Sequence, residues 1–286
     1  MMRLGRHAFA EDATLMMAIV NRTPDSFFDK GATWDESAAL SRVREVVAEG
    51  AEIVDIGGIK AAPGAVISEA EERSRVVDFV AAVRSEFPGL VISVDTWRAG
   101  VADAVCAAGA DVINDAWGGA DPELVSVAAA RDVGLVCTHT GGATVRTRPY
   151  RREYSDVMAS VVADVMGYAS RALEAGVSAE SIVIDPAHDF GKNTFHSLEV
   201  TRRLSEMVGL GYPVLVSLSN KDFVGETLDL PVGSRLTGTL AATAVCALAG
   251  AQIYRVHQVA PTRETVDMVW SIAGRRAPAR AIRGLQ

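Results

Sequence analysis

The sequence predicts an α/β fold, a single eight-stranded (β/α)8 barrel of the TIM type. Eight short runs rich in β-branched residues alternate with helix-like stretches, which is typical of a parallel sheet covered by helices. No GxGxxG turn follows the first run, which favours a closed barrel, although periodicity alone leaves an open doubly wound sheet possible. Such a barrel uses about 250 residues, so we expect one domain over residues 1–286.

The predicted elements follow one another without a linker. In chain order, the strand candidates are LMMAIVN, EIVDIGG, LVISVDT, DVINDAW, LVCTHT, SIVIDP, PVLVSLS and IYRVHQ. Apolar residues at three- and four-residue spacing predict helices between them, for example over residues 68–84, 154–175 and 238–249. Residues 1–13 are expected to form an N-terminal arm, and residues 275–286, rich in Arg and Ala, a frayed C-terminal tail.

Composition argues against several classes of protein. The chain is 49% apolar and 22% charged, which suffices for a large core. Its net charge of −8, without a basic stripe, argues against a nucleic-acid partner. The three cysteines, Cys106, Cys137 and Cys246, fit neither a disulfide framework nor a zinc spacing. No signal peptide and no apolar run of about 18 residues is recognised, so we expect a cytoplasmic protein without a membrane partner.

Polar residues stand near the carboxyl ends of nearly all predicted strands, where a buried parallel strand is otherwise apolar. They are Asn21, Asp55, Asp95, Thr96, Asn114, Asp115, His139, Asp185, Ser219, Lys221, Arg255 and His257. In a (β/α) barrel these ends meet at the face where such enzymes place their chemistry. A single residue of this kind could equally cap a helix or loop, and Asp55 and Asp115 are candidates for that structural role.

The first chemical group in this set suits a flat, nitrogen-rich heterocycle. Carboxylate and amide groups of Asp95, Asn114 and Asp185 fit the donor edge of such a ring. Lys221 offers a cation to a ring carbonyl or ring nitrogen. No Ser-His-Asp or Cys-His arrangement and no GxSxG turn is found, so a nucleophilic enzyme is not indicated.

The second chemical group suits a phosphate or pyrophosphate. Arg255 and His257 are two residues apart on one predicted strand, so their side chains point to the same side. Asn21 could bind the same anion directly, or through a magnesium ion held mainly by phosphate oxygens and water. The segment FGKNT is not a phosphate loop, because Pro186 and Asn193 stand where that motif needs Gly and Ser or Thr.

With these residues in view, the chain resembles the dihydropteroate synthase family from residue 15 to about residue 270. NRTPDSFFD is similar to the family's NVTPDSFSD, and EGAEIVDIGG, SVDT, GADVINDAWGG, FGK, the KxFxG of SNKDFVG, RLTGTLAA and RVH recur in order. The resemblance implies an enzyme that joins a dihydropterin-methyl pyrophosphate to p-aminobenzoate and releases pyrophosphate with Mg2+. It also implies a homodimer through the last helices, where the run GTLAATAVCALAG fits either an interface or plain core.

The resemblance also implies a role for each site residue. Asp95, Asn114, Asp185 and Lys221 would hold the pterin. Asn21, Arg255 and His257 would hold the pyrophosphate, with Asn21 as the metal ligand and with Lys221, Arg255 and His257 as the catalytic groups. A pterin-stabilised methylene cation needs no protein nucleophile, so an oriented pterin and a stabilised leaving group would suffice.

Three loops depart from the family pattern. GGESTRPGA becomes GGIKAAPGA, which puts Ala61 and Ala62 where the family has Thr and Arg. DPGIGFGK becomes DPAHDFGK, which adds bulk and a charge in place of two glycines. An SRKS-like turn becomes SNKD, so Asn220 replaces an arginine and Asp222 adds a carboxylate. An acid at about 4 Å from a substrate carboxylate costs roughly 1 to 4 kcal/mol.

These changes remove donors and add acids where an anionic aminobenzoate is expected. We therefore expect a weak or inactive synthase paralogue that keeps a pterin or anion pocket and serves as a binding or regulatory protein. A transferase with a different second substrate is the first alternative, favoured if Lys60, His188 and Asp222 form a complementary site. The others are an active synthase of folate biosynthesis and a pterin barrel that serves a corrinoid protein, although no corrinoid module is recognised. The sequence does not assign roles to Lys60, His188 and Asp189.

Overall fold

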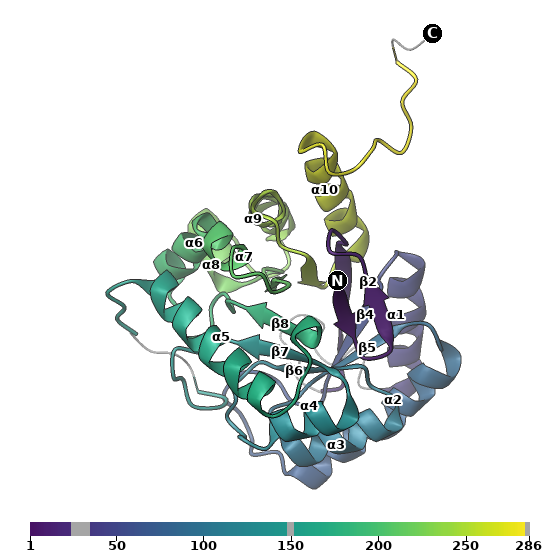
Figure 1. The fold of residues 1–286 in the computed structure, drawn as a ribbon. Helices are drawn as coiled ribbons and strands as arrows, with labels where there is room; N and C mark the ends of the chain where they lie inside the picture. Colours follow the sequence, from purple (N-terminus) through teal and green to yellow (C-terminus); the bar gives the residue numbers. More distant parts are fainter. Residues whose placement is uncertain (24–34, 148–151, 284–286) are drawn as a thin grey trace.

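Eight parallel strands form a barrel in the computed structural model, which describes residues 1–23, 35–147 and 152–283 (Figure 1). The barrel strands are β3 (Leu15–Asn21), β4 (Ile53–Gly57), β5 (Val91–Asp95), β6 (Val112–Asp115), β7 (Gly134–Thr138), β8 (Ile182–Asp185), β9 (Leu215–Val216) and β10 (Ile253–Val256). Their order is β8-β7-β6-β5-β4-β3-β10-β9, and a parallel bridge between Ile184 of β8 and Val214 joins the two ends. The predicted fold class is therefore confirmed.

Helices surround the barrel and connect its strands (Figure 1). They are α1 (Glu36–Ala48), α2 (Glu69–Glu86), α3 (Ala99–Ala108), α4 (Leu124–Arg131), α5 (Val157–Glu174), α6 (Thr194–Arg202), α7 (Leu204–Val208), α8 (Asp222–Leu228), α9 (Leu236–Ala249) and α10 (Val259–Ile272), with a short 3-10 helix at Ala179–Ser181. The α5 helix begins later than the apolar spacing predicts, because the Asp156 side chain caps it by accepting a hydrogen bond from the Ala159 amide.

Each predicted strand run overlaps a barrel strand, but the seventh strand is much shorter than its apolar run. Of PVLVSLS, only Leu215–Val216 forms a strand. Pro213 has no amide hydrogen to donate, and its carbonyl accepts from the Ile184 amide at 2.9 Å. The residues after Val216 leave the ladder and turn toward the carboxyl end of the barrel, where Ser217 lines the cavity described below.

A short antiparallel hairpin closes the amino end of the barrel, a feature that the sequence showed only as an arm. It consists of β1 (Met2–Leu4) and β2 (His7–Phe9). Met2 and Leu4 are buried against the inward-facing apolar residues at the starts of the strands, such as Leu15 and Ile53. The barrel is therefore filled at this end, and open space for a ligand lies at the other end.

Side chains alternate between the barrel interior and the helices along each strand, as the pleat requires. In β3, Met16, Ala18 and Val20 pack against the outer helices, whereas Leu15 and Met17 face inward. The same alternation in the other strands gives an apolar interior layer near the hairpin and a polar layer near the carboxyl ends. This alternation decides which polar strand-end residues can reach a common site.

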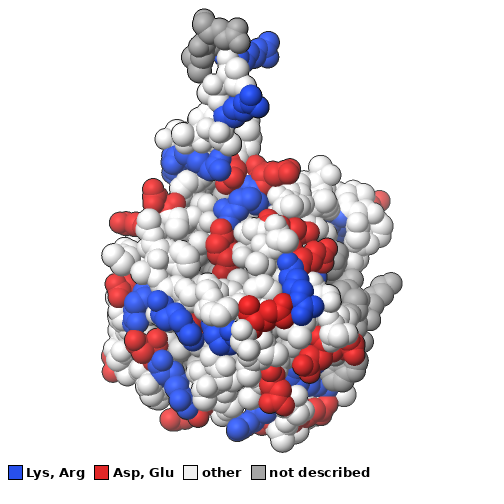
Figure 2. Space-filling model, turned by 90° about the vertical axis from the view of Figure 1, so that its right-hand side faces the viewer, with Lys and Arg blue, Asp and Glu red and all other residues white. Residues whose placement is uncertain are grey.

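The C-terminal segment after α10 projects away from the barrel, and its side chains are exposed over residues 273–283 (Figure 1). On the face shown in Figure 2, acidic and basic side chains are interspersed. Within the described ranges, no helix combines the length and apolar character that a membrane span needs.

Candidate active site

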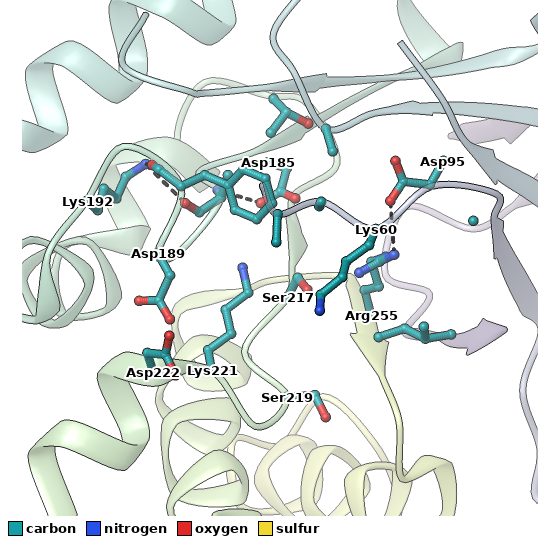
Figure 3. A pocket seen from close by; sticks show the side chains of 18 of the residues that line it. Lys60, Asp95, Asp185, Asp189, Lys192, Ser217, Ser219, Lys221, Asp222 and Arg255 are labelled. Atoms are coloured by element: carbon teal, nitrogen blue, oxygen red, sulfur yellow. Dashed lines mark hydrogen bonds and ion pairs between the residues drawn. The ribbon is translucent and has the colours of Figure 1, made fainter. Parts of the chain in front are cut away.

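A cavity of about 700 Å3 lies at the carboxyl end of the barrel. Its lining includes the seven residues to which the sequence assigned pterin or pyrophosphate binding, namely Asn21, Asp95, Asn114, Asp185, Lys221, Arg255 and His257. Ala61, Ala62 and Asp222 line it as well. These side chains come from strand ends and loops that are far apart in the sequence (Figure 3). The cavity is therefore large enough for a two-ring ligand and is lined by groups of both charges.

Three members of the polar strand-end set face away from this cavity. Asp115 accepts hydrogen bonds from the Tyr168 hydroxyl at 2.7 Å and the Trp117 amide at 2.9 Å. Thr96 donates to the Glu72 carboxylate at 2.7 Å. His139 follows the inward-facing end of β7 by one residue and is therefore turned outward, where it is fully buried. The position of Asp115 therefore fits the structural role that the sequence left possible, and His139 is not part of the site.

Asp55 lies one layer beneath the cavity and links its two halves. Its carboxylate accepts from Arg255 Nε at 2.7 Å, from Ser93 Oγ at 2.6 Å and from Asn114 Nδ2 at 3.2 Å. Arg255 also donates to Asp95 at 3.2 Å (Figure 3). Asp55 is completely buried, so its charge is balanced inside the barrel. The guanidinium expected to meet an anion is thus held in place by the same network that holds the amide of Asn114.

Asp95 and Asp185 are shifted toward the protonated form. Burial raises the pKa of Asp95 to about 7, while the nearby Arg255 acts in the opposite direction. Burial likewise raises the pKa of Asp185, and the positive charge of Lys221 opposes that shift. The Asp185 carboxylate also accepts from the Ala187 amide at 2.7 Å. With a pKa of about 7, the Asp95 carboxyl group can accept or donate hydrogen bonds near neutral pH, which suits the edge of a heterocycle.

Two lysines, Lys192 and Lys221, flank Phe190. Lys221 donates to the His188 carbonyl, and its ammonium lies 5.1 Å from the centre of the Phe190 ring. Lys192 donates to the Ala187 and Phe190 carbonyls at 3.1 and 3.0 Å. Its ammonium also lies 2.6 Å from His139 Nδ1, and burial lowers its pKa to about 7. Lys192 therefore stabilises the loop after β8, and both lysines line the cavity.

His257 is a neutral group beside Arg255. Its Nδ1 lies 2.9 Å from Ser219 Oγ, and burial lowers its pKa to about 3, with the charges of Arg255 and Arg42 adding to the shift. A neutral imidazole supplies a hydrogen bond to an anion without a charge of its own. Asn21 ends β3 beside Gly57, and a side chain at Gly57 would begin 3.8 Å from Asn21 Oδ1. Arg255 therefore carries the positive charge of this half-site.

The loop after β4 presents alanines where the family pattern has Thr and Arg. Arg146 spans this loop and donates to three of its carbonyls, those of Lys60 at 3.3 Å, Ala62 at 3.2 Å and Ala65 at 2.6 Å. Lys60 extends from the loop into the cavity (Figure 3). The loop therefore keeps a defined course without the hydroxyl and guanidinium groups of the family pattern.

The loop after β8 keeps the backbone that glycines allow. Ala187 and Asp189 stand at the two glycine positions of the family pattern and have φ angles of 49° and 67°. A non-glycine residue in this left-handed region costs roughly 1–2 kcal/mol. The Asp189 carboxylate offsets part of this cost by accepting from Ser197 Oγ at 3.0 Å and from the Phe223 amide at 3.2 Å.

His188 lies beneath this loop and does not line the cavity. Its ring is fully buried, stacks on Phe223 with centroids 5.6 Å apart, and contacts Thr201 Oγ1 at 3.1 Å. Burial lowers the pKa of His188 well below its usual value, so the ring is neutral. Lys60, His188 and Asp222 therefore do not form the joint complementary site that the sequence left open.

The turn after β9 is organised around Arg235. Asn220 is buried with φ 57°, donates to Gln258 at 3.3 Å and does not line the cavity. Arg235 donates to the Asn220 carbonyl and to the Asp222 carboxylate, both at 2.9 Å. This ion pair reduces the repulsion that the sequence led us to expect from Asp222. The loss of the family's arginine is therefore the main change at this turn.

Two residues that line the cavity were not predicted from the sequence. Thr138 ends β7 and faces inward, and among the described residues its buried hydroxyl has no hydrogen-bond partner. Ser217 follows β9 and lies near Arg255 in the view of Figure 3. Both belong to predicted strand runs, and the alternation of LVCTHT and PVLVSLS around the barrel would have turned both inward.

Comparisons with known proteins agree with this geometry. The family model described as "Pterin binding enzyme" matches residues 17–257. A Mycobacterium tuberculosis protein named "Inactive dihydropteroate synthase 2" is 55% identical over 96% of this chain and 88% of its own length. The Bacillus subtilis protein named "Dihydropteroate synthase" is 42% identical over 87% of this chain and 85% of its own.

Among solved structures, the Yersinia pestis dihydropteroate synthase in complex with a sulfonamide drug superposes with a TM-score of 0.88 at 32% identity. The match covers 94% of this chain and 97% of the Yersinia pestis chain. The sequence motifs, the barrel and the cavity at its carboxyl end thus lead to one conclusion: the chain belongs to the pterin-binding enzyme family and is a dihydropteroate synthase-like protein.

Proposed function

We propose that this protein keeps the pterin and pyrophosphate half-site of a dihydropteroate synthase, has a degraded p-aminobenzoate half-site, and has weak or no synthase activity. One observation carries the proposal. The strand-end groups meet around one cavity, whereas the loop after β4 contributes Ala61 and Ala62 to the same cavity. The relative named as inactive supports this proposal more than the relative named as a synthase, because its identity to this chain is higher.

In the proposed roles, the strand ends bind and orient, and no residue acts as a nucleophile. Asp95, Asn114, Asp185 and Lys221 would bind the pterin, since they offer carboxyl, amide and ammonium groups at one side of the cavity. Arg255 and His257 would stabilise the leaving pyrophosphate, and with Lys221 they are the proposed catalytic groups. The proposed ligand is thus a pterin or another small molecule with an anionic group.

Magnesium is the cofactor that fits the proposed chemistry. Among the described residues, no group of three or more His, Cys, Asp or Glu could hold a metal ion. Asn21 offers an amide oxygen at the cavity, and Mg2+ is commonly held by one such protein ligand together with substrate phosphates and water. The donor set therefore fits an ion that arrives with a pyrophosphate, and the ion would neutralise charge on that leaving group.

We also propose a homodimer through the last helices. Val245 and Leu248 of α9 and Met268 and Ile272 of α10 are between 48% and 71% exposed. The two helices contact one another, so these side chains supply an apolar surface of the kind that subunit interfaces bury. A cytoplasmic location, without nucleic-acid or membrane partners, accords with the three thiols, which form no disulfide.

Steady-state kinetics test the proposal. We expect this protein to turn over dihydropterin pyrophosphate with p-aminobenzoate at least about a hundredfold less efficiently than a family member with intact loops, which corresponds to about 2.7 kcal/mol. Two variants test the contributions of the two loops separately. Ala61→Thr with Ala62→Arg restores the donors after β4, and Asn220→Arg with Asp222→Ser restores the turn after β9.

Parallel binding titrations with the pterin pyrophosphate and with p-aminobenzoate give a second readout. The proposal expects the pterin pyrophosphate to bind and p-aminobenzoate to bind weakly. Full synthase activity in the unchanged protein would show the proposal to be wrong. Absence of pterin binding would show that the first half-site is lost as well.

A further inference from the structure

Lysine is rare in this chain, yet it is concentrated at the cavity. Lys and Arg together number 28, of which four are lysines, at positions 30, 60, 192 and 221. Lys60, Lys192 and Lys221 all line the cavity, and Lys30 lies outside the described residues. The chain uses arginine for its other basic positions, so Lys60 is not explained as one of many solvating charges.

The other cations of the cavity are engaged by the protein. Arg255 pairs with Asp55 and Asp95, and the ammonium groups of Lys192 and Lys221 donate to backbone carbonyls. By contrast, the structure shows no hydrogen bond or ion pair for the Lys60 ammonium with any residue that it describes. Lys60 is therefore the lining cation whose charge is available to a ligand.

The loop that carries Lys60 is held in place by Arg146. The three hydrogen bonds from Arg146 to the carbonyls of Lys60, Ala62 and Ala65 tie the loop to the segment after β7. A cation on a fixed loop loses less conformational entropy on binding than one on a mobile loop. In the family pattern the guanidinium stands at the position of Ala62, so Lys60 returns a positive charge to the loop two residues earlier.

We infer that the Lys60 ammonium binds an oxyanion of the ligand at the altered half-site. The ligand then combines this anion with a heterocycle that binds at the strand ends. The inference rests on the proposed function and names the anion site within that same cavity. The oxyanion can come from a carboxylate or from a phosphate. Because an ammonium is a point charge and lacks the planar fork of a guanidinium, Lys60 selects charge more than carboxylate geometry.

Binding measurements with two probes test the inference. Inorganic pyrophosphate and p-aminobenzoate are titrated into the wild type, Lys60→Ala, Lys60→Arg and the matched charge control Arg280→Ala, which lies on the exposed tail. Lys60→Ala is expected to lower the affinity for at least one of the two anions by about tenfold, as for the loss of a hydrogen bond to a charged group. Lys60→Arg is expected to retain most of the affinity, and Arg280→Ala is expected to match the wild type. The anion whose affinity falls in Lys60→Ala identifies the oxyanion as a phosphate or a carboxylate.

Amine acetylation with mass spectrometry gives an independent readout on the unmodified protein. Lys192 is almost completely buried, whereas Lys60 is partly exposed, so Lys60 is expected to react and to be protected by the bound anion. Equal affinity of the wild type and Lys60→Ala for both anions, or no protection of Lys60 at saturation, would overturn the inference. A neutral hydroxymethylpterin distinguishes this failure from failure of the proposed function, because it probes the strand ends without the Lys60 site.

Discussion

The strand ends of the barrel and the loops above them respond to substitution in different ways. At the strand ends, Arg255 is balanced by Asp55 and Asp95 inside the barrel, so the loss of one partner leaves a buried charge. In the loops, the altered residues are accommodated locally, as when Arg235 pairs with the exposed Asp222. Loops of this kind can lose a substrate contact without a large loss of stability. The half-site built from loops is therefore the one that can diverge while the barrel persists.

The largest expected effect tests the buried side of this comparison. Asp55→Asn removes one member of a pair whose atoms lie 2.7 Å apart and leaves Arg255 with Asp95 as its remaining ion-pair partner in the described structure. We expect the free energy of unfolding to fall by about 3 kcal/mol, as for other broken buried pairs. Denaturant unfolding at neutral pH measures the change.

Asp222→Asn is the matched control for Asp55→Asn. It breaks a pair of similar length with Arg235, at 2.9 Å, but the Asp222 side chain is 69% exposed. An exposed pair contributes roughly 0 to 1 kcal/mol, so this variant should unfold close to the wild type. Equal losses in the two variants would contradict the distinction between strand ends and loops.

The next effect concerns ligand binding at the strand ends. Asp185→Asn keeps a side-chain oxygen for the Ala187 amide but removes the carboxyl group that faces the cavity. We expect affinity for a neutral hydroxymethylpterin to fall about ten- to a hundredfold, in line with a lost hydrogen bond to a charged group. Calorimetric titration measures this loss.

Ala62→Gly is the control for Asp185→Asn on the loop side of the cavity. Ala62 lines the same cavity from the loop side, and its methyl group makes no hydrogen bond. Pterin affinity in Ala62→Gly should therefore stay near the wild-type value. A similar loss of pterin affinity in both variants would show that the loop contributes to pterin binding.

The strand ends were the predictable part of this molecule. Apolar runs and polar residues at their ends located the eight strands and seven of the residues that line the cavity, because pleated strands impose a period of two. That rule, applied around the barrel, also separates the inward Asp95 from the outward Asp115. It could not reveal the network of Asp55, since the contact with Arg255 joins residues that are 200 positions apart.

The loops were predictable as differences in sequence but not as structure. That Asn220 would be buried and that Asp222 would pair with Arg235 depends on the course of the chain between α8 and α9. That His188 would stack beneath the loop on Phe223 depends on packing between α6 and α8. Local patterns carry neither piece of information, since both arise from contacts between separate elements.

Lys192 is expected to change the pH dependence of stability, with a smaller effect per pH unit than the loss expected for Asp55→Asn. The pKa of Lys192 falls from 10.5 to about 7 in the folded protein because of burial. Between these two values the unfolded chain binds the proton more than the folded chain does, so the free energy of unfolding rises with pH. Relative to Lys192→Gln, the wild type should gain stability from pH 7 to pH 10, by at most about 1.4 kcal/mol per pH unit.

Urea unfolding at several pH values measures this difference between the wild type and Lys192→Gln. Other titrating groups contribute to both proteins and cancel in the comparison, provided that His139, which contacts Lys192, stays neutral. Burial and the charge of Lys192 lower the pKa of His139 to about 3, so it is neutral over this range. Parallel stability curves from pH 7 to pH 10 would rule out a depressed pKa for Lys192.

The smallest expected effect on stability, but a clear one on the loop, comes from Arg146→Ala. Arg146 ties the loop after β4 through hydrogen bonds to three backbone carbonyls, including that of Lys60. Global stability should fall by less than about 1 kcal/mol, as for most surface substitutions. Trypsin cleaves after lysine and arginine, and the bond after Lys60 becomes accessible when the loop opens. We expect cleavage there to be about tenfold faster in Arg146→Ala, because local opening then costs about 1.4 kcal/mol less. Cleavage after Arg280 in the exposed tail is the internal control and should be unchanged. If both proteins are cut after Lys60 at the same rate, the loop is not held by Arg146.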